Sequence, residues 1–253
     1  MKMQKIDDFF IPDNKVESIS KETYRQAGPV IDTLKSIARM TYQSIYVIDY
    51  FKKNFLYVSN NPLFLCGFQP DEVREMGFSF YFNQVSKDEI DMLLEINRAS
   101  FSFYNGTPID ERMKLFITYD FHIQDRDYKI LINHKLTPIL LADNGHIWLA
   151  ACFVSLSSNQ KEGNIEVHID GRKEYWSYSL EDHQWKNKNE IKLKSREKEV
   201  LIYSAQGFTE EKIAEKMHIA KATVKFHKQI IFNQLNVKSI SAAISIASHK
   251  KMI

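Results

Sequence analysis

The chain has 253 residues, of which 44% are hydrophobic and 26% are charged. This composition is typical of a folded globular protein and argues against intrinsic disorder, and the length suits two domains better than one. The sequence contains no run of about 18 apolar residues that could cross a membrane, and residues 1–10 lack the apolar stretch of a secretory signal peptide. We therefore expect a cytoplasmic protein with no membrane partner.

The charge is unevenly distributed along the chain. The whole sequence carries 34 basic and 32 acidic residues, but the segment from Glu190 to Ile253 carries 12 basic and 6 acidic ones. The remaining residues, 22 basic and 26 acidic, are mildly negative. A basic end on an acidic body favours a polyanionic partner for that end, although a lysine-rich solvated surface would produce the same counts.

Only two cysteines are present, Cys66 and Cys152, and each lies among apolar neighbours. Free cysteine is among the most buried residue types, so we expect two buried thiols. A structural disulfide would need an oxidising compartment and a metal site would need more ligands, so neither is expected.

The first part of the chain mixes predicted strands and helices. In chain order these are a helix over Val30–Met40, strands over Ser44–Asp49 and Phe55–Ser59, a short helix from Pro70, an amphipathic helix over Lys87–Ala99, and strands over Leu115–Tyr119, Tyr128–His134 and His146–Leu156. The strand segments are rich in β-branched and aromatic residues, and the longer helix repeats its apolar residues at helical spacing. This order predicts an α+β domain built on one antiparallel sheet with short helices.

Four segments of this region follow the layout of a PAS domain. They are Tyr46–Asp49, Tyr57–Asn60, Cys66–Phe68 and Pro70–Val73. The region from Val30 to Leu156 therefore resembles a PAS domain, which implies a module that senses a signal or dimerises. Asn60 is expected to bond the backbone of the turn after its strand. Gly67 is expected to adopt a φ angle that other residues avoid.

The sequence carries no cofactor signature alongside this resemblance. A haem would need an axial ligand on a helix facing a pocket, whereas His122, His134 and His146 lie in predicted strands or turns. Cys66 lacks the polar helix motif of a flavin–thiol photosensor. We therefore expect no cofactor and no metal. The many aromatic residues from Phe78 to Tyr104 suit either a pocket for a small-molecule ligand or a purely structural or dimerising core.

The segment from Ile165 to Tyr178 predicts a β-hairpin, because alternating apolar residues precede the turn signal Asp170-Gly171. This hairpin either extends the sheet or forms a rigid connector. The predicted organisation is an N-terminal extension over 1–29, a PAS-like sensor or dimerisation domain over 30–156, a hairpin and linker over 157–190, and an all-α domain over 191–253.

The last sixty residues predict four helices. Ser195 is expected to cap the first, which Gly207 ends. Thr209 is expected to cap the second, with two acidic residues at its positive end. The third has an apolar stripe that ends at Leu235, and the fourth covers about Ser239–Ser248. Two short helices, a tight turn and a third helix with a basic outer face predict a helix-turn-helix that spans Thr209 to Lys228.

This region resembles the LuxR-type DNA-binding domain from Leu193 to about Lys250. The matching residues are Arg196-Glu197, Glu199-Val200-Leu201, Gly207, Ile213-Ala214, Thr223-Val224-Lys225, His227 and Leu235. The sequence departs from the family at Lys194, where Thr is usual, at Ala220, where Ser is usual, and at Ile240, where Arg is frequent. The first two departures weaken or shift helix caps, each worth about 1 kcal/mol.

The resemblance implies that the third helix enters the major groove of double-stranded DNA. It assigns Lys225, Phe226 and Gln229 to base contacts, and Lys221, Thr223 and Lys228 to positions nearer the phosphates. His227 is expected to pack inside the domain. The fourth helix is expected to form a homodimer contact through Ile240, Ala243, Ile244 and Ala247, and Val30–Met40 is a second candidate surface.

The sequence thus predicts a bacterial, dimeric, sequence-specific transcription regulator whose PAS-like domain senses a small molecule or a partner. The alternative is a protein-interaction or signalling module in which DNA binding is weak. An enzyme is not expected, because the sequence shows no nucleophile–base pair, phosphate loop or metal-ligand cluster.

Overall fold

The computed structural model describes residues 6–253, so residues 1–5, which begin the predicted N-terminal extension and the segment considered as a signal peptide, lie outside the described residues. The chain divides into two compact units, one ending at Lys188 and the other covering Asn189–Ile253, and each is described by itself. Across residues 6–253, no single helix is long and apolar enough to cross a membrane. Only the bent pair formed by residues 221–235 and 240–249 passes that test, on length and composition alone.

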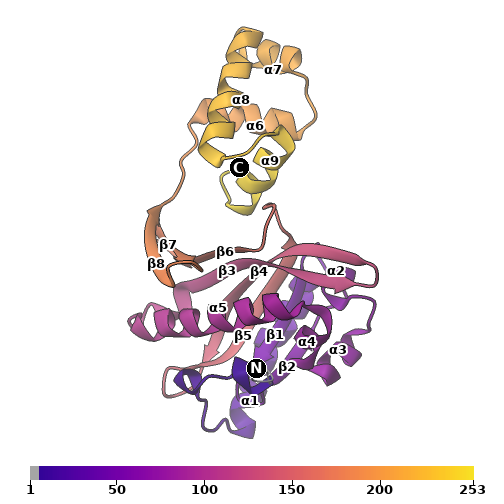
Figure 1. The fold of residues 1–253 in the computed structure, drawn as a ribbon, viewed down its shortest axis with the longest axis vertical. Coiled ribbons are helices and arrows are strands. Elements are labelled where there is room, and N and C mark those ends of the chain that lie inside the picture. Colours follow the sequence, from indigo (N-terminus) through magenta and orange to yellow (C-terminus); the bar gives the residue numbers. More distant parts are fainter. Residues whose placement is uncertain (1–5) are drawn as a thin grey trace. The chain divides into compact units, whose positions relative to one another are not determined.

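The first unit is built on one eight-stranded sheet (Figure 1). Its strands lie in the order β2-β1-β5-β4-β3-β6-β7-β8, and the pairings from β2 through β7 are antiparallel. The strands are β1 (Ser44–Asp49), β2 (Asn54–Val58), β3 (Leu115–Asp125), β4 (Tyr128–Leu141), β5 (Ile147–Leu156), β6 (Gly163–Ile169), β7 (Glu174–Ser179) and β8 (Gln184–Asn189). The predicted α+β architecture with one antiparallel sheet and helices is confirmed.

Helices cover both faces of this sheet. One face carries α2 (Pro62–Leu65), α3 (Pro70–Met76), α4 (Ser79–Gln84) and α5 (Lys87–Gly106), and the other carries α1 (Lys21–Ala38). Short 3₁₀ helices cover Ile6–Phe9, Pro12–Asn14 and Arg112–Lys114. Tyr46 packs in the large core beside α5, whereas its neighbour Val47 packs under α1 with Trp148. Successive strand residues point to opposite faces, so the two cores share strand β1.

Two local predictions in this unit need correction. Helix α1 begins at Lys21, where Ser20 caps it by accepting a hydrogen bond from the Thr23 amide at 3.0 Å, so the predicted helix over Val30–Met40 is only its C-terminal part. The turn after β2 is held by Asn61 rather than by Asn60, because the Asn61 side chain accepts a hydrogen bond from the Leu63 amide at 3.1 Å. Gly67 has a φ of +84°, as predicted.

The predicted hairpin after residue 165 extends the sheet. Strand β6 pairs with β3, and β7 pairs with β6 through Val167 opposite Trp176. Gly171, in the turn, has a φ of +84°. Strand β8 follows β7 at the sheet edge, although its polar, Lys- and Asn-rich sequence had indicated a linker.

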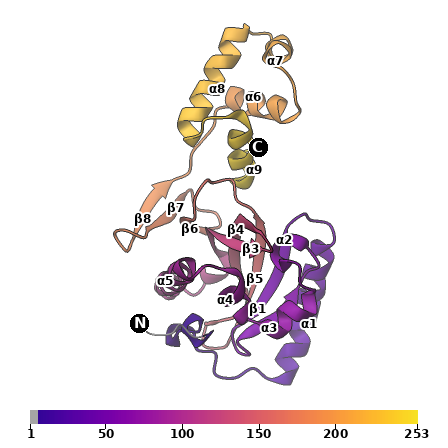
Figure 2. The same cartoon turned by 45° about the vertical axis from the view of Figure 1, so that its right-hand side comes forward.

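The second unit consists of four helices (Figure 2): α6 (Ser195–Ala205), α7 (Glu210–Met217), α8 (Lys221–Leu235) and α9 (Ile240–His249). Its core contains Val200, Leu201, Ile213, Val224 and Ile231. The predicted all-α four-helix architecture is confirmed.

The caps of these helices agree only partly with the predictions. Thr209 caps α7 and accepts a hydrogen bond from the Lys212 amide at 3.3 Å. The N-cap of α6 is Lys194 rather than Ser195, and the buried Glu197 side chain accepts a hydrogen bond from the Lys194 amide at 2.6 Å. Ala220 is the N-cap of α8 and provides no side-chain hydrogen bond. The carboxylate of Glu197 thus supplies one half of a capping box at the start of α6, and the other half is missing because the Lys194 side chain has no acceptor for the Glu197 amide.

A polar cluster lies inside the aromatic core of the first unit. The Tyr46 hydroxyl hydrogen-bonds that of Tyr81 and lies 2.5 Å from Nε2 of His134. His134 is 1% exposed, and its Nδ1 has no partner among the described residues. Burial lowers the pKa of His134 to about 3, so this ring stays neutral at pH 7.

This histidine makes the free energy of unfolding of the first unit fall on acidification. The unfolded chain takes up a proton near the ordinary pKa of about 6.5, whereas the folded unit resists protonation of His134 down to about pH 3. The unfolded state therefore binds more protons in this window, and stability is lost by about 1.4 kcal/mol per pH unit as the pH falls through it.

The measurement is urea unfolding from pH 7 to pH 4.5, followed by the fluorescence of Trp148, Trp176 and Trp185, which all lie in the first unit. His134→Gln should flatten the pH dependence, and the matched control His146→Asn should leave it as in the wild type. Identical pH slopes for the three proteins would contradict the assignment.

Candidate nucleic-acid interface

Helix α8 is held by its apolar side in the second unit. Val224, Ile231 and Leu235 are buried, and the helix contacts α6, α7 and α9 (Figure 2). His218 ends α7 in the left-handed conformation, with a φ of 52°, and this turn directs the chain into α8. His227 is half-buried, and its Nδ1 is buried without a partner among the described residues. The buried stripe therefore determines which side of α8 faces solvent.

The three residues predicted to contact bases lie on that solvent-facing side. Lys225 and Gln229 are exposed, and Phe226 is 63% exposed. Their spacing places them on neighbouring positions of one helical surface. The Gln229 amide donates a hydrogen bond to Oδ1 of Asn233 at 3.0 Å, which orients the side chain along the helix. The structure brings these three residues together on one face, and we call Lys225, Phe226 and Gln229 the α8 face.

The residues predicted to lie near phosphates have different surroundings. Lys228 forms an ion pair with Glu210 at 3.1 Å, and its side chain is only 17% exposed. Lys221 pairs with Glu211 and holds the pKa of that carboxyl down to about 2. Thr223 is half-buried. The two acids were expected only as residues at the positive end of α7. Their ion pairs could not be predicted from local sequence, because the lysines are 18 and 10 residues further along the chain.

Lys225 thus differs from the other two lysines of α8. Within residues 6–253 it forms no ion pair, whereas Lys221 and Lys228 each face an acid from the first turn of α7. An ion pair lowers the positive potential that a lysine offers to a polyanion, and a half-buried pair is less screened by solvent than an exposed one. Lys225 is therefore the most available positive charge on this helix.

The predicted dimer stripe of α9 is divided between core and surface. Ala243 and Ala247 are fully buried within the core of the second unit, while Ile240 and Ile244 are only partly buried. Only the two isoleucines therefore offer side-chain surface to a partner.

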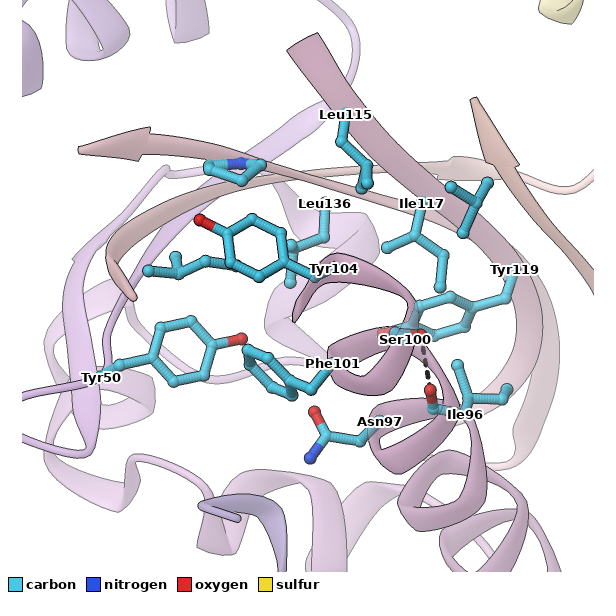
Figure 3. Close-up of a pocket in the computed structure, with 13 residues that line it drawn as sticks. Tyr50, Ile96, Asn97, Ser100, Phe101, Tyr104, Leu115, Ile117, Tyr119 and Leu136 are labelled. Carbon is cyan, nitrogen blue, oxygen red and sulfur yellow. Dashed lines mark hydrogen bonds between the residues drawn. The ribbon is translucent and has the colours of Figure 1, made fainter. Parts of the chain in front are cut away.

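The first unit contains a cavity between α5 and the sheet (Figure 3). Its interior volume is about 40 Å³. Its lining consists of Tyr50, Ile96, Asn97, Ser100, Phe101, Tyr104, Leu115, Ile117, Tyr119, Leu136, Pro138, Ile147 and Val167. No acidic or basic side chain lines it, so the cavity suits an uncharged occupant.

Most polar groups of this lining already have partners inside the protein. The Ser100 hydroxyl donates to the Ile96 carbonyl at 2.5 Å, Tyr104 donates to the Gly145 carbonyl at 3.0 Å, and Asn97 donates to the Phe9 carbonyl at 2.8 Å. The hydroxyls of Tyr50 and Tyr119 have no hydrogen-bond partner among the described residues, and burial raises the pKa of both. These two phenols are therefore available to donate to an occupant.

The residues considered as cofactor ligands do not line this cavity. His134 lies beside Tyr46, His122 lies 3.1 Å from Glu89, and His146 lies 2.8 Å from the Lys15 carbonyl. Cys66 is buried and its thiol lies 3.6 Å from the Phe64 carbonyl. Over the described residues, no group of three or more His, Cys, Asp or Glu side chains forms a metal-binding arrangement.

Comparison with known proteins identifies similarity in the second unit. Residues 192–247 match the family model described as bacterial regulatory proteins of the luxR family. Over 61 residues the chain is 38% identical to the oxygen regulatory protein NreC of Staphylococcus carnosus (strain TM300) and to that of Staphylococcus epidermidis (strain ATCC 12228 / FDA PCI 1200). The match spans 24% of this chain and 28% of the length of these curated relatives.

Two solved structures align with most of the chain at low similarity. The crystal structure of the phage VqmA–DPO complex has 14% identity and a TM-score of 0.32, and covers 90% of this chain and 91% of that chain. The Vibrio cholerae VqmA dimer in the absence of target DNA has 15% identity and a TM-score of 0.30, and covers 88% of each chain. Because both TM-scores are below 0.5, the assignment to a family rests on the match of the family model alone. Over residues 192–247 the chain carries a helix-turn-helix domain that belongs to the LuxR family of bacterial regulatory proteins.

Proposed function

We propose that the protein is a sequence-specific transcription regulator that binds double-stranded DNA as a dimer and responds to a small molecule. The observation that carries the DNA-binding part is the α8 face, which exposes a cation, an aromatic ring and an amide on the third helix of a LuxR-family domain. The excess of 12 basic over 6 acidic residues from Glu190 onward supports the same role, because phosphate neutralisation supplies much of the affinity for DNA.

The residues of α8 divide into three roles in this proposal. Lys225, Phe226 and Gln229 read base edges in the major groove, where glutamine can bond adenine bidentately and an aromatic ring can contact a thymine methyl. Lys221, which is more exposed than Lys228, turns from Glu211 to a phosphate, and Thr223 lies near the same strand. Lys228 remains paired with Glu210 and holds α7 against α8.

The proposed dimer is the arrangement that matches the two-fold symmetry of typical operator sites. Two copies of a helix-turn-helix domain recognise two half-sites about one helical turn apart. Ile240 and Ile244 form the candidate contact on α9, because they are the members of the predicted stripe that reach the surface. A closed symmetric contact through these residues would match a palindromic site.

The roles proposed for the residues of α8 predict different effects of their substitution on DNA affinity and on its salt dependence. Lys225→Ala and Gln229→Ala should each weaken binding to a selected duplex by about 1–3 kcal/mol. Lys221→Ala should weaken binding to all sequences and reduce the slope of log affinity against log salt by about 0.9. Lys228→Met should leave that slope unchanged, because its charge is already paired.

The measurement is fluorescence anisotropy between 50 and 200 mM salt, with a duplex enriched from a random library. Lys198→Ala, on the exposed side of α6, is the matched control. No salt-dependent binding by the wild type would instead favour an interaction module with weak DNA binding. One protomer per site in light scattering of the complex would reject the dimer.

The sensing part of the proposal rests on the cavity of the first unit. Its volume of about 40 Å³ accommodates about three waters, so a ligand of the size of one six-membered ring enters only when the cavity enlarges. Tyr50 and Tyr119 would donate hydrogen bonds to it, so the ligand must carry acceptor atoms and no net charge. We expect no cofactor in this unit.

A thermal-shift screen of neutral ring compounds tests this ligand class. Compounds with acceptor atoms should raise the melting temperature of the wild type, because a ligand that binds only the folded state stabilises it. The shift should shrink in Tyr119→Phe and in Tyr50→Phe, while Tyr128→Phe, at an exposed position, should keep it. Charged hits with equal shifts in all variants, or a visible chromophore in the purified protein, would contradict the proposal.

A further inference from the structure

Helix α5 contacts both the cavity and the hairpin formed by β7 and β8. It supplies Ile96, Ser100 and Tyr104 to the cavity (Figure 3), and it contacts the hairpin through Phe103 and Glu95. Phe103 comes about two turns after Ile96 and so lies on nearly the same side of the helix, whereas Glu95 lies about a quarter to a half turn away from the cavity residues. A movement of the helix therefore changes the surroundings of the cavity and of the hairpin together.

The contacts between α5 and the hairpin are specific. The ring of Phe103 lies 5.2 Å from that of Trp176 on β7 and 5.3 Å from that of Trp185 on β8. Oε1 of Glu95 accepts a hydrogen bond from the Tyr178 hydroxyl at 3.1 Å and lies 2.7 Å from Nδ1 of His183 in the turn between the strands. One aromatic and one charged residue of α5 thus hold both strands and their turn.

The hairpin depends on these contacts for its position. In the sheet, β7 pairs with β6 over only three residue pairs, and β8 lies at the sheet edge with mostly exposed residues. Strand β8 ends at Asn189, where the second unit begins, and α6 starts at Ser195. A displacement of the hairpin therefore acts on the chain directly before the DNA-binding domain.

We infer that α5 transmits occupancy of the cavity to the β7–β8 hairpin, with Phe103 and Glu95 as positioning residues. The inference rests on the proposed function for the role of the cavity. A ligand that enters must displace α5 from the sheet, because the surrounding core is close-packed and yields little elsewhere. The contacts of Phe103 and Glu95 then differ between the filled and empty states, and this difference is what a signal needs to shift a population.

A side chain placed in the cavity substitutes for the unidentified ligand. Ser100→Leu inserts an apolar group from α5, and Ile117→Phe inserts one from the sheet. Ser100→Ala is the matched control, because it removes the same hydroxyl and fills nothing. Amide hydrogen exchange of residues 174–189 in the full chain is the readout, since exchange reports local opening.

The expected result is a change of at least about threefold in the exchange rates of the hairpin with either cavity-filling variant. The same substitutions in a Phe103→Ala background should leave the hairpin rates unchanged, and Phe103→Tyr should restore the response because it keeps the ring. Glu95→Ala should reduce the response of residues 178–183. A purely structural role of Phe103 would alter the baseline rates without abolishing the response to filling.

Two results would overturn the inference. One is a hairpin that does not respond to either filling variant, and the other is a response of equal size with and without the Phe103 ring. Urea unfolding by tryptophan fluorescence verifies that each variant folds. Because this readout needs no DNA, a failure of DNA binding in the Lys225→Ala series counts against the proposed function alone.

Discussion

The burial of strand β5 on both faces is the constraint on which the first unit depends. All residues from Ile147 to Cys152 are buried, and they are divided between the core beside α5 and the core under α1. A strand with two apolar faces needs cover on both sides, and the antiparallel sheet obtains it from α1 on one side and α2–α5 on the other. The cavity, the hairpin contacts and the position of α5 all follow from this two-sided packing.

Topology adds a second constraint. The sheet order places β4 and β3 between β5 and β6, so the chain after Leu156 must cross two strands. The buried carboxylate of Asp120 holds this connecting segment in place, because it accepts hydrogen bonds from the side chains of Asn159 at 2.6 Å and Asn164 at 2.9 Å. Burial raises the pKa of Asp120, and an unpaired buried charge would be costly without these amide donors. These hydrogen bonds of Asp120 therefore order the segment that leads from β5 to β6.

In the second unit too, buried apolar residues determine which surface faces solvent. Its apolar stripe on α8 leaves the α8 face on the opposite side, and the ion pair of Lys228 with Glu210 fastens α7 to α8. A half-buried pair of this kind contributes geometry as much as stability. Lys228 thus forms an ion pair within the domain, whereas Lys225 on the α8 face is available to a polyanion.

Local patterns in the sequence were enough for the element types, the antiparallel α+β sheet and the helix-turn-helix, because strand alternation, turn signals and the helical stripe ending at Leu235 are properties of short segments. The residues of the α8 face were also identifiable, because the resemblance to the LuxR-type domain indicated Lys225, Phe226 and Gln229 and helical spacing places them together. Contacts between distant segments decided the rest. The ion pairs of Glu210 and Glu211 and the contacts of Glu95 with the hairpin join residues that are 10 to 88 positions apart, and the cavity lining extends from Tyr50 to Val167. Strand β8 went unrecognised because its polar sequence carries no apolar alternation, and its place depends on packing against α5. Sequence periodicity reports which face of an element is apolar, but only tertiary packing determines which partner covers it.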